Sequence, residues 1–400
     1  MAEIYLIAVR RRVYAAQQRR RRGHSQEKIY RTRQTLFQQT EEEIYDKYRL
    51  SSAAILELID LLKPQLEHQT LRGCAIPTHV QVLCSLHLLA SGSYQGVIAV
   101  AGGVSQSAVS RFLTAFLDAL VTHMSHFIYL PRNEAEINST KLDFYRIANF
   151  PHVIGCVYGT HIQICPPGNL EHLFRNRKCT HSLNIQVVCD AHYVITDIVA
   201  KFPGSTHDSY IFRHSGIHQR LERGEFGDGY LLGRATDTLQ TYTQVTVHTN
   251  QDFLTVYFLC PTGDSAYALR PWIMTPFLTP SNECERRYNN AHKRTRNLIE
   301  RTFGLLKARF RCLHRSGGAL QYTPITAFKI VVACAILHNI ATRRGLPLTP
   351  ADPDPDDEEQ EQPHRHHVDR STANQGRLRR EHIASQYFGR YVSTPTILTY

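Results

Sequence analysis

Three runs rich in valine and isoleucine, between residues 153 and 202, constrain the fold of this chain more than any other feature. They are VIGCVYGTHIQI (153–164), SLNIQVVCD (182–190) and YVITDIVAKF (193–202), and polar loops separate them. Short runs of this composition predict strands. A helical pattern follows at 208–224, then an apolar run that ends before residue 264, and then a long helical pattern. Strands followed by alternating strand and helix predict a layered α/β domain.

Two isolated acids, Asp264 and Glu300, stand in the strongly basic stretch 263–311. Asp264 follows FLCPTG, an apolar run typical of a strand that ends at a glycine turn. Glu300 belongs to a helical pattern whose apolar positions share one buried face: Ile299, Phe303, Leu306, Phe310 and Leu313. A carboxylate at a strand end and another on a later helix can jointly hold Mg²⁺, which prefers oxygen ligands and substrate phosphates. We therefore expect both acids to be catalytic metal ligands.

Glu300 also lies in a row of basic side chains along its own helix. The other positions of that row are Lys293, Arg296, Gly304, Lys307 and Arg311. Two interpretations stay open. The row could hold the phosphate backbone of DNA beside a catalytic carboxylate, or Glu300 could simply form a surface ion pair with Arg296 one turn earlier.

Several motifs resemble one known family. GDSAYALRPWIMTPF, RYNNAHKRTRNLIERTFGLLKARFRCL, ALQY and ACAILHNI are similar to the endonuclease domain of Harbinger-type DDE transposases, and the resemblance covers roughly residues 47–348. It implies a ribonuclease-H-like mixed sheet with flanking helices, in which the first strand is central and carries the first metal ligand. It also implies Mg²⁺- or Mn²⁺-dependent hydrolysis of phosphodiester bonds and a separate Myb-like DNA-binding partner protein.

The chain departs from this family at the first metal-ligand position. In VIGCVYGTHIQI, Tyr158 stands where the family pattern has its first aspartate. A tyrosine hydroxyl is neutral at pH 7, so we expect weak cleavage or none. Asp208, after PGSTH, matches a family pattern and is a secondary metal candidate, although a helix start also favours a carboxylate as a cap. We interpret Asp190 and Asp197 as structural acids at strand ends.

Residues 234–263 look like an insertion. GEFGDGYLLG before them and DSAYALRPW after them resemble the two halves of one family segment, so that joining Gly233 to Asp264 restores the family pattern. The inserted piece starts at the Gly233–Arg234 junction and ends in FLTVYFLCPTG, which suggests a translated intron. We place it within a nuclease-like domain at 140–348.

Basic and helical segments precede that domain. We expect residues 1–46 to form a basic, disordered arm, with ten Lys/Arg against two Glu in the first 33 positions. Such basic blocks are typical of disordered arms, nuclear-import signals and phosphate clamps, and all three interpretations stay open. The segment 47–130 predicts helices, one of them stopping near Pro64. Three further helical patterns between 78 and 120 fit a helix-turn-helix-like all-α domain, or any small bundle. The predicted DNA-binding residues of both segments are Arg10, Arg11, Arg12, Arg19, Arg20, Arg21, Arg22, Ser105, Gln106, Ser107 and Arg111.

Composition sets the remaining bounds. A net charge of +11 favours a polyanionic partner. Ten widely spaced cysteines contain no C-x-x-C pair, and we expect reduced thiols. The best membrane candidate, 330–340, is about half the length needed, so we expect no membrane association. Residues 349–375 read as an acidic disordered linker and 376–400 as a C-terminal segment of unknown role.

Two functions compete on this sequence. The first is a DNA-binding, divalent-metal-dependent nuclease-like protein of transposase origin, with cleavage impaired by Tyr158. We expect it in the nucleus, with the cytoplasm as a second location. The second is a DNA-binding or adaptor protein that keeps the transposase fold without catalysis.

Overall fold

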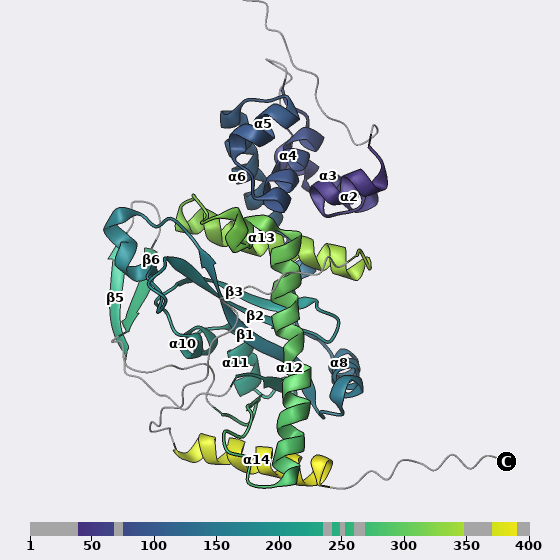
Figure 1. Ribbon diagram of the computed structural model, residues 1–400, viewed down its shortest axis with the longest axis vertical. Coiled ribbons are helices and arrows are strands. Elements are labelled where there is room, and N and C mark those ends of the chain that lie inside the picture. The colour runs from purple at the N-terminus through teal and green to yellow at the C-terminus, as the bar shows by residue number, and fades with distance from the viewer. Residues whose placement is uncertain are drawn as a thin grey trace, which may run out of the picture.

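The computed structural model describes residues 39–67, 75–234, 242–248, 253–259, 269–347 and 370–389; for 242–248, 253–259 and 370–372 only the backbone is described. A helical layer lies at one end of the molecule and a five-stranded mixed sheet flanked by helices forms the rest (Figure 1). Residues 1–38 of the predicted arm 1–46, Asp264 and residues 348–369 lie outside the described residues, so the predictions on them and the domain boundaries stay predictions. The end of the predicted disordered arm is a correction, because Glu41–Tyr48 form a helix.

The sheet has the strand order β3-β2-β1-β4-β7. Strands β1 (Val153–Gln163), β2 (Ser182–Cys189) and β3 (Ile195–Pro203) pair antiparallel and match the three predicted runs. The short strands β4 (Tyr230–Leu232) and β7 (Ile273–Met274) continue the sheet in parallel with β1. The predicted α/β class is therefore confirmed, and β1 is the central strand.

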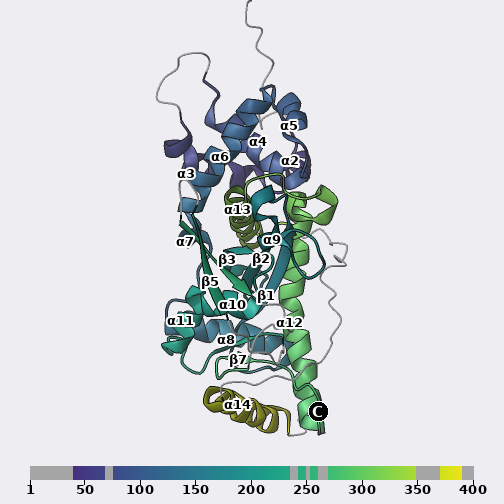
Figure 2. The ribbon, with the colours of Figure 1, turned by 90° about the vertical axis from the view of Figure 1, so that its left-hand side faces the viewer.

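Successive side chains of β1 point to opposite faces of the sheet. Tyr158 belongs to the core on the side of α12 (Glu283–Arg309) and α13 (Pro324–Arg343). Val157 belongs to the core that includes α10 (Asp208–Arg213) and α11 (Gly216–Glu222). Figure 2 shows α12 on one side of the sheet and α11 on the other. The sheet therefore separates two differently built faces.

Strands β5 (Tyr242–His248) and β6 (Phe253–Leu259) pair with each other in a separate two-stranded sheet. We expected the strand before Asp264 to belong to the main domain sheet. That prediction is wrong for the described residues, since β4 and β7 pair directly across the segment that contains β5 and β6. The five-stranded sheet therefore closes without the residues we interpret as an insertion, although whether they are one stays a prediction.

The helical layer comprises α2 to α6: Glu41–Tyr48, Ser52–Leu66, Thr78–Ser91, Gln95–Gly102 and Gln106–Thr122. Helix α3 ends at Leu66, two residues after Pro64, which confirms the predicted stop near that proline; a proline in the last turn removes only one helical hydrogen bond. The axes of α5 and α6 meet at 99° around the left-handed Gly103. Two further helices, α7 (Met124–Phe127) and α8 (Glu134–Ala148), lead into β1.

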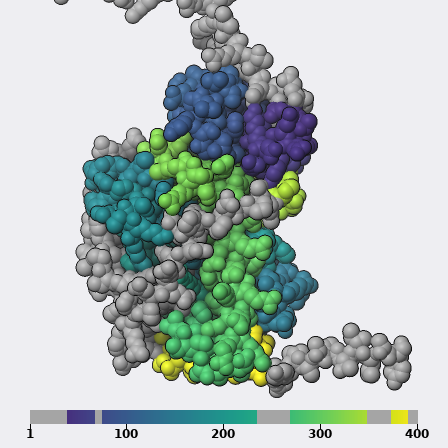
Figure 3. Space-filling view, viewed as in Figure 1, coloured from purple at the N-terminus to yellow at the C-terminus, as the bar shows by residue number. Residues whose placement is uncertain are grey.

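Helix α13 joins the two layers, and the helical layer is seated on it in Figure 3. Over its 20 residues α13 is long and apolar enough to cross a membrane, so our estimate of half the needed length was wrong. Most of the helix is buried inside the protein, however. Its apolar surface therefore serves as core between the layers.

Short elements complete the described chain. They are α9 (Glu171–Phe174) and the 3₁₀ turns η2 (Gly168–Leu170), η3 (Arg311–Leu313) and η4 (Arg315–Gly317). The last helix, α14 (Arg370–Phe388), lies across the base of the sheet domain (Figure 1).

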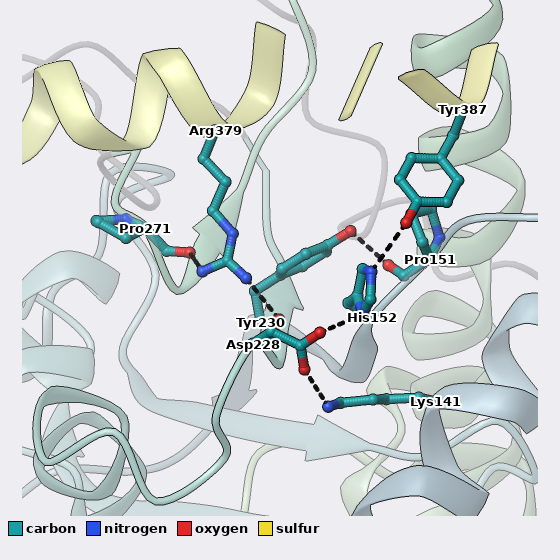
Figure 4. A network of polar contacts seen from close by, with 8 residues as sticks. All are labelled: Lys141, Pro151, His152, Asp228, Tyr230, Pro271, Arg379 and Tyr387. Atoms are coloured by element: carbon teal, nitrogen blue, oxygen red, sulfur yellow. Dashed lines mark hydrogen bonds and ion pairs between the residues drawn. The ribbon is translucent and has the colours of Figure 1, made fainter. Parts of the chain in front are cut away.

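A polar network fastens α14 to that base (Figure 4). Arg379 donates to the carbonyl oxygens of Pro271 at 2.8 Å and of Asp228 at 2.6 Å, and its guanidinium lies 5.2 Å from the centre of the Tyr230 ring. The Tyr387 hydroxyl lies 3.2 Å from Nε2 of His152. Arg379 thus ties together the chain just before β4 and just before β7.

Candidate active site

Tyr158 lies in the middle of β1, opposite Val187 of β2. Its residue surface is 7% exposed, and its ring centre is 6.1 Å from that of Phe303 on α12. The residue at the expected first metal-ligand position therefore faces α12, the helix that carries Glu300. A core position for this tyrosine, which is what a tyrosine on a central strand ordinarily has, agrees with this burial.

Helix α12 begins at the Asn282 cap, whose side chain accepts from the Glu285 amide. The predicted apolar face is buried, although the helix ends at Arg309, so that Phe310 and Leu313 follow it. Glu300 sits at the edge of that face with a side chain 35% exposed. The helix thus presents one carboxylate beside the central strand, as the sequence predicted.

Arg296 connects Glu300 to Tyr158. Its Nη2 lies 2.6 Å from Oε1 of Glu300, and the guanidinium carbon lies 5.8 Å from the centre of the Tyr158 ring. The Arg296 side chain is only 16% exposed, and its Nη1 is buried with no hydrogen-bond partner among the described residues. The ion pair that we left open as an alternative is therefore present, but it is partly buried at the candidate site.

The side chains beneath this pair are neutral. Burial raises the pKa of the Cys189 thiol to about 12 and that of the Cys156 thiol well above its usual range. Burial also lowers the pKa of His292 to about 3, and its Nε2 lies 3.1 Å from the Met274 carbonyl oxygen. At neutral pH these three groups add no charge to the site.

Asp208 lies on the other face of the sheet. It is the first residue of α10, where His207 rather than Asp208 is the N-cap. A Cβ placed on Gly159 would be only 2.5 Å from Oδ1 of Asp208, and Asn184 Nδ2 donates to the same oxygen at 2.8 Å. Because Gly159 and Tyr158 point to opposite faces, Asp208 cannot replace the missing carboxylate beside Glu300, and our secondary metal assignment is wrong.

The two remaining acids have different environments. Asp190 Oδ1 accepts from the amides of His192 and Val194 at 2.8 and 2.9 Å, which is a structural role in the turn after β2. Asp197 lies within β3 instead of in a turn, which corrects its predicted place. Burial raises its pKa to about 6, although the nearby Arg220 opposes the shift.

The side chains at the site do not fit a two-metal centre. Two-metal hydrolysis uses carboxylates to bridge and fix the ions. Here Tyr158 offers one neutral oxygen, and Glu300 is already bonded to a guanidinium. Within the described parts of the chain, no group of three or more His, Cys, Asp or Glu residues could hold a metal ion.

The predicted DNA-contacting side chains divide into accessible and buried ones. Ser105 caps α6 by accepting from the Ala108 amide at 3.2 Å, and Gln106, Ser107 and Arg111 are exposed near the same helix end. Lys293 and Arg311 are also exposed.

Lys307 of the predicted basic row is only 2% exposed. Its place in a surface row was a wrong prediction, because the last turns of α12 are covered by η3 and α13.

Two contacts and one exposed side chain could not be foreseen from the sequence. Gly159 provides the space for the Asp208 carboxylate, Arg296 stacks near Tyr158, and Arg315 extends the exposed basic residues beside Arg311. Only the glycine after Tyr158 carried a signal, since glycine within a strand often marks a close approach.

Comparison with known proteins agrees with this architecture. A family model described as a DDE superfamily endonuclease matches residues 157–339. HARBI1 of Homo sapiens, a protein named as a nuclease, is 36% identical over 77% of this chain and 79% of its own length. HARBI1 of Mus musculus is 33% identical over 87% of this chain and 91% of its own length. The Arabidopsis thaliana protein named antagonist of like heterochromatin protein 1 is 25% identical over 68% and 64%. No solved structure matches the chain.

Proposed function

Because this chain belongs to the Harbinger transposase-derived nuclease family, we propose that it is a DNA-binding protein with a DDE endonuclease fold whose phosphodiester hydrolysis is weak or absent. DDE endonucleases generally use divalent metal ions such as Mg²⁺ or Mn²⁺. The observation that carries the proposal is the cluster of Tyr158, Arg296 and Glu300, in which a tyrosine and an ion pair stand where carboxylates should hold metal.

The sheet supports a ribonuclease-H-like arrangement. Its first strand is central, two antiparallel strands follow on one side, and two parallel strands lie on the other. That arrangement would give β1 the first ligand and α12 the last. Residues 158 and 300 do lie on the same face of the sheet, joined through Arg296.

The geometry of α5 and α6 supports DNA binding through a helix-turn-helix. Their 99° angle lies in the range of that motif, whose second helix enters the major groove. The start of α6 is exposed and carries Gln106, Ser107 and Arg111, short polar and basic side chains suited to phosphates and base edges. Helix α6 is then the recognition helix.

Two exposed arginines lie where the helical layer contacts the sheet domain. The backbone of Arg311 packs against Gly92, at the end of α4, where a Cβ would be only 3.1 Å away. Arg311 and Arg315 are exposed beside this contact. Their charges would contact phosphates next to the site read by α6, without reading sequence.

A salt series tests DNA binding. We expect Arg111→Gln combined with Arg311→Gln to lower the slope of log K against log salt by about 2, near one unit per lost phosphate contact. Arg286→Gln is the matched control, since Arg286 lies at the far end of α12 and pairs with Glu283 at 2.9 Å. Unchanged affinity and slope in the double variant would refute this binding surface.

A non-catalytic adaptor is the second candidate function. The same tyrosine and ion pair favour it, and the Arabidopsis thaliana relative is named for antagonism of a heterochromatin protein instead of cleavage. A protein that binds no duplex DNA at low salt but co-purifies with a chromatin protein would favour the adaptor. In both cases we propose a nuclear location, a Myb-like DNA-binding partner and no membrane association.

A further inference from the structure

We propose that Arg296 is the resident cation of the candidate active site, and that its guanidinium takes the electrostatic place of a metal ion beside Glu300. The inference rests on the proposed function, because it assumes that the site descends from a DDE centre. A resident cation has a consequence that the loss of one carboxylate alone would not have. An acid restored at position 158 would be neutralised by Arg296 and would not by itself create a metal site.

The first support is the placement of the guanidinium between the two ligand positions. Arg296 Nη2 contacts Glu300 at 2.6 Å, while the guanidinium carbon lies 5.8 Å from the ring of Tyr158. A carboxylate replacing that ring would lie on the same face, directed toward the same cation. Arginine keeps its charge at every pH in which a protein is folded, so this cation cannot be titrated away.

The second support is burial. The Arg296 side chain is 16% exposed, and Nη1 is buried without a hydrogen-bond partner among the described residues. A buried N–H donor without a hydrogen-bond partner costs free energy. Nη1 of Arg296 should therefore donate readily to another anionic group. An aspartate introduced at position 158 would supply that acceptor. The new carboxylate would then bind Arg296 together with Glu300, and the two carboxylates would not be free to hold a metal ion.

The third support comes from the register of β1 and β4. Leu232 pairs with Cys156 in parallel, so extending both strands by two residues brings position 234 beside position 158. Arg234 occupies that position, where joining Gly233 to Asp264 would instead place an aspartate. The three positions that should carry acids are therefore Tyr158, Arg234 and Glu300. Together with Arg296 they have a formal charge sum of +1, from one acid and two arginines.

A direct measurement of metal binding distinguishes exclusion of the ion by Arg296 from the simple loss of the carboxylate at position 158. The probe is Mn²⁺, followed by the electron paramagnetic resonance of the free ion in the presence of the full-length protein. Neither the unsubstituted protein nor its Tyr158→Asp variant should bind Mn²⁺ detectably at submillimolar concentration. Because Arg234 also stands beside position 158, these variants are made in a common Arg234→Gln background. There, Tyr158→Asp combined with Arg296→Gln should bind at least ~100-fold more tightly than Tyr158→Asp alone, because a nearby unit charge of the same sign as the ion is removed.

The matched control is Tyr158→Asp combined with Arg301→Gln. Arg301 follows Glu300 directly but stacks 5.3 Å from the ring of Tyr193 and faces solvent. The same arginine-to-glutamine change on the same helix should therefore leave Mn²⁺ binding absent. Circular dichroism melting of each variant verifies that it is folded. Should Arg296→Gln prevent folding, Arg296→Lys, with a shorter reach and no planar fork, gives the intermediate case.

Two outcomes would overturn the inference. If Tyr158→Asp alone binds Mn²⁺ as tightly as the Arg296 double variant, the guanidinium does not compete with the metal ion. Folded double variants that fail to bind at all would mean that Arg296 is not what excludes it. DNA affinity is measured on the same proteins. Failure of DNA binding together with the expected Mn²⁺ pattern would remove the proposed function and leave the resident cation in place.

Discussion

Arg379 gives the sharpest test of how the sheet domain is held together. Its guanidinium donates to the carbonyl oxygens of Asp228 and Pro271, which lie before β4 and before β7, and stacks near the Tyr230 ring. Those two strands flank the segment 234–263. We expect Arg379→Met, which keeps most of the aliphatic stem, to loosen α14 and destabilise the β4–β7 edge.

The size of the effect follows from these contacts. Hydrogen bonds from a charged donor contribute about 1.5–3 kcal/mol each, and partial exposure of Arg379 reduces that figure. With a cation–π term of about 0.5–1 kcal/mol, the loss is roughly 2–4 kcal/mol. At about 2–4 °C per kcal/mol for a domain of this size, the melting temperature should fall by roughly 4–16 °C.

The assay uses the single tryptophan of the chain, Trp272, which is adjacent to Pro271. Its fluorescence during thermal unfolding should report the release of α14 at or below the global transition. Arg377→Met is the control on the same helix, because Arg377 lies in an exposed ion pair with Glu381 at 3.8 Å. Equal, small shifts for both variants would refute the view that Arg379 fastens the two strands.

Three further predictions follow from other contacts. Gly159→Ala should cost about 1–3 kcal/mol in urea denaturation, because the new Cβ would lie 2.5 Å from Asp208, while Gly168→Ala, with open space around it, should be near neutral. Asp197 has a pKa raised to about 6 by burial, so stability is lost as pH rises through 4 to 6; Asp197→Asn should be about 2–3 kcal/mol more stable than the parent at pH 7 and equal at pH 4. Removal of residues 234–263 should leave a cooperatively folded protein, since β4 and β7 pair directly; loss of cooperative melting would refute an insertion.

The main strands and helices could be predicted because their patterns are local. Valine-rich runs gave β1 to β3, and the spacing of Ile299, Phe303 and Leu306 gave the buried face of α12. Strands β4 and β7 are only three and two residues long, so no pattern marks them. They become strands through pairing with β1, which is a tertiary effect.

The candidate site was predictable in its members but not in its arrangement. Tyr158 and Glu300 were found from motifs, and they do share a face through Arg296. Asp208 was misplaced because sequence distance does not tell which side of a sheet a later helix covers. Lys307 was misplaced for a related reason: helical periodicity identifies a row of residues, but not which end of the row another helix will bury.

Nicking of supercoiled plasmid by the purified protein in Mg²⁺ or Mn²⁺ bears most directly on the loss of catalysis. The protein as written should nick no faster than its Glu300→Gln variant, because Tyr158 supplies no carboxylate and Arg296 already neutralises Glu300. Tyr158→Asp combined with Arg296→Gln and the removal of 234–263 should nick above that background. Robust nicking by the unsubstituted protein that Glu300→Gln abolishes would contradict the proposal that catalysis at this site is impaired.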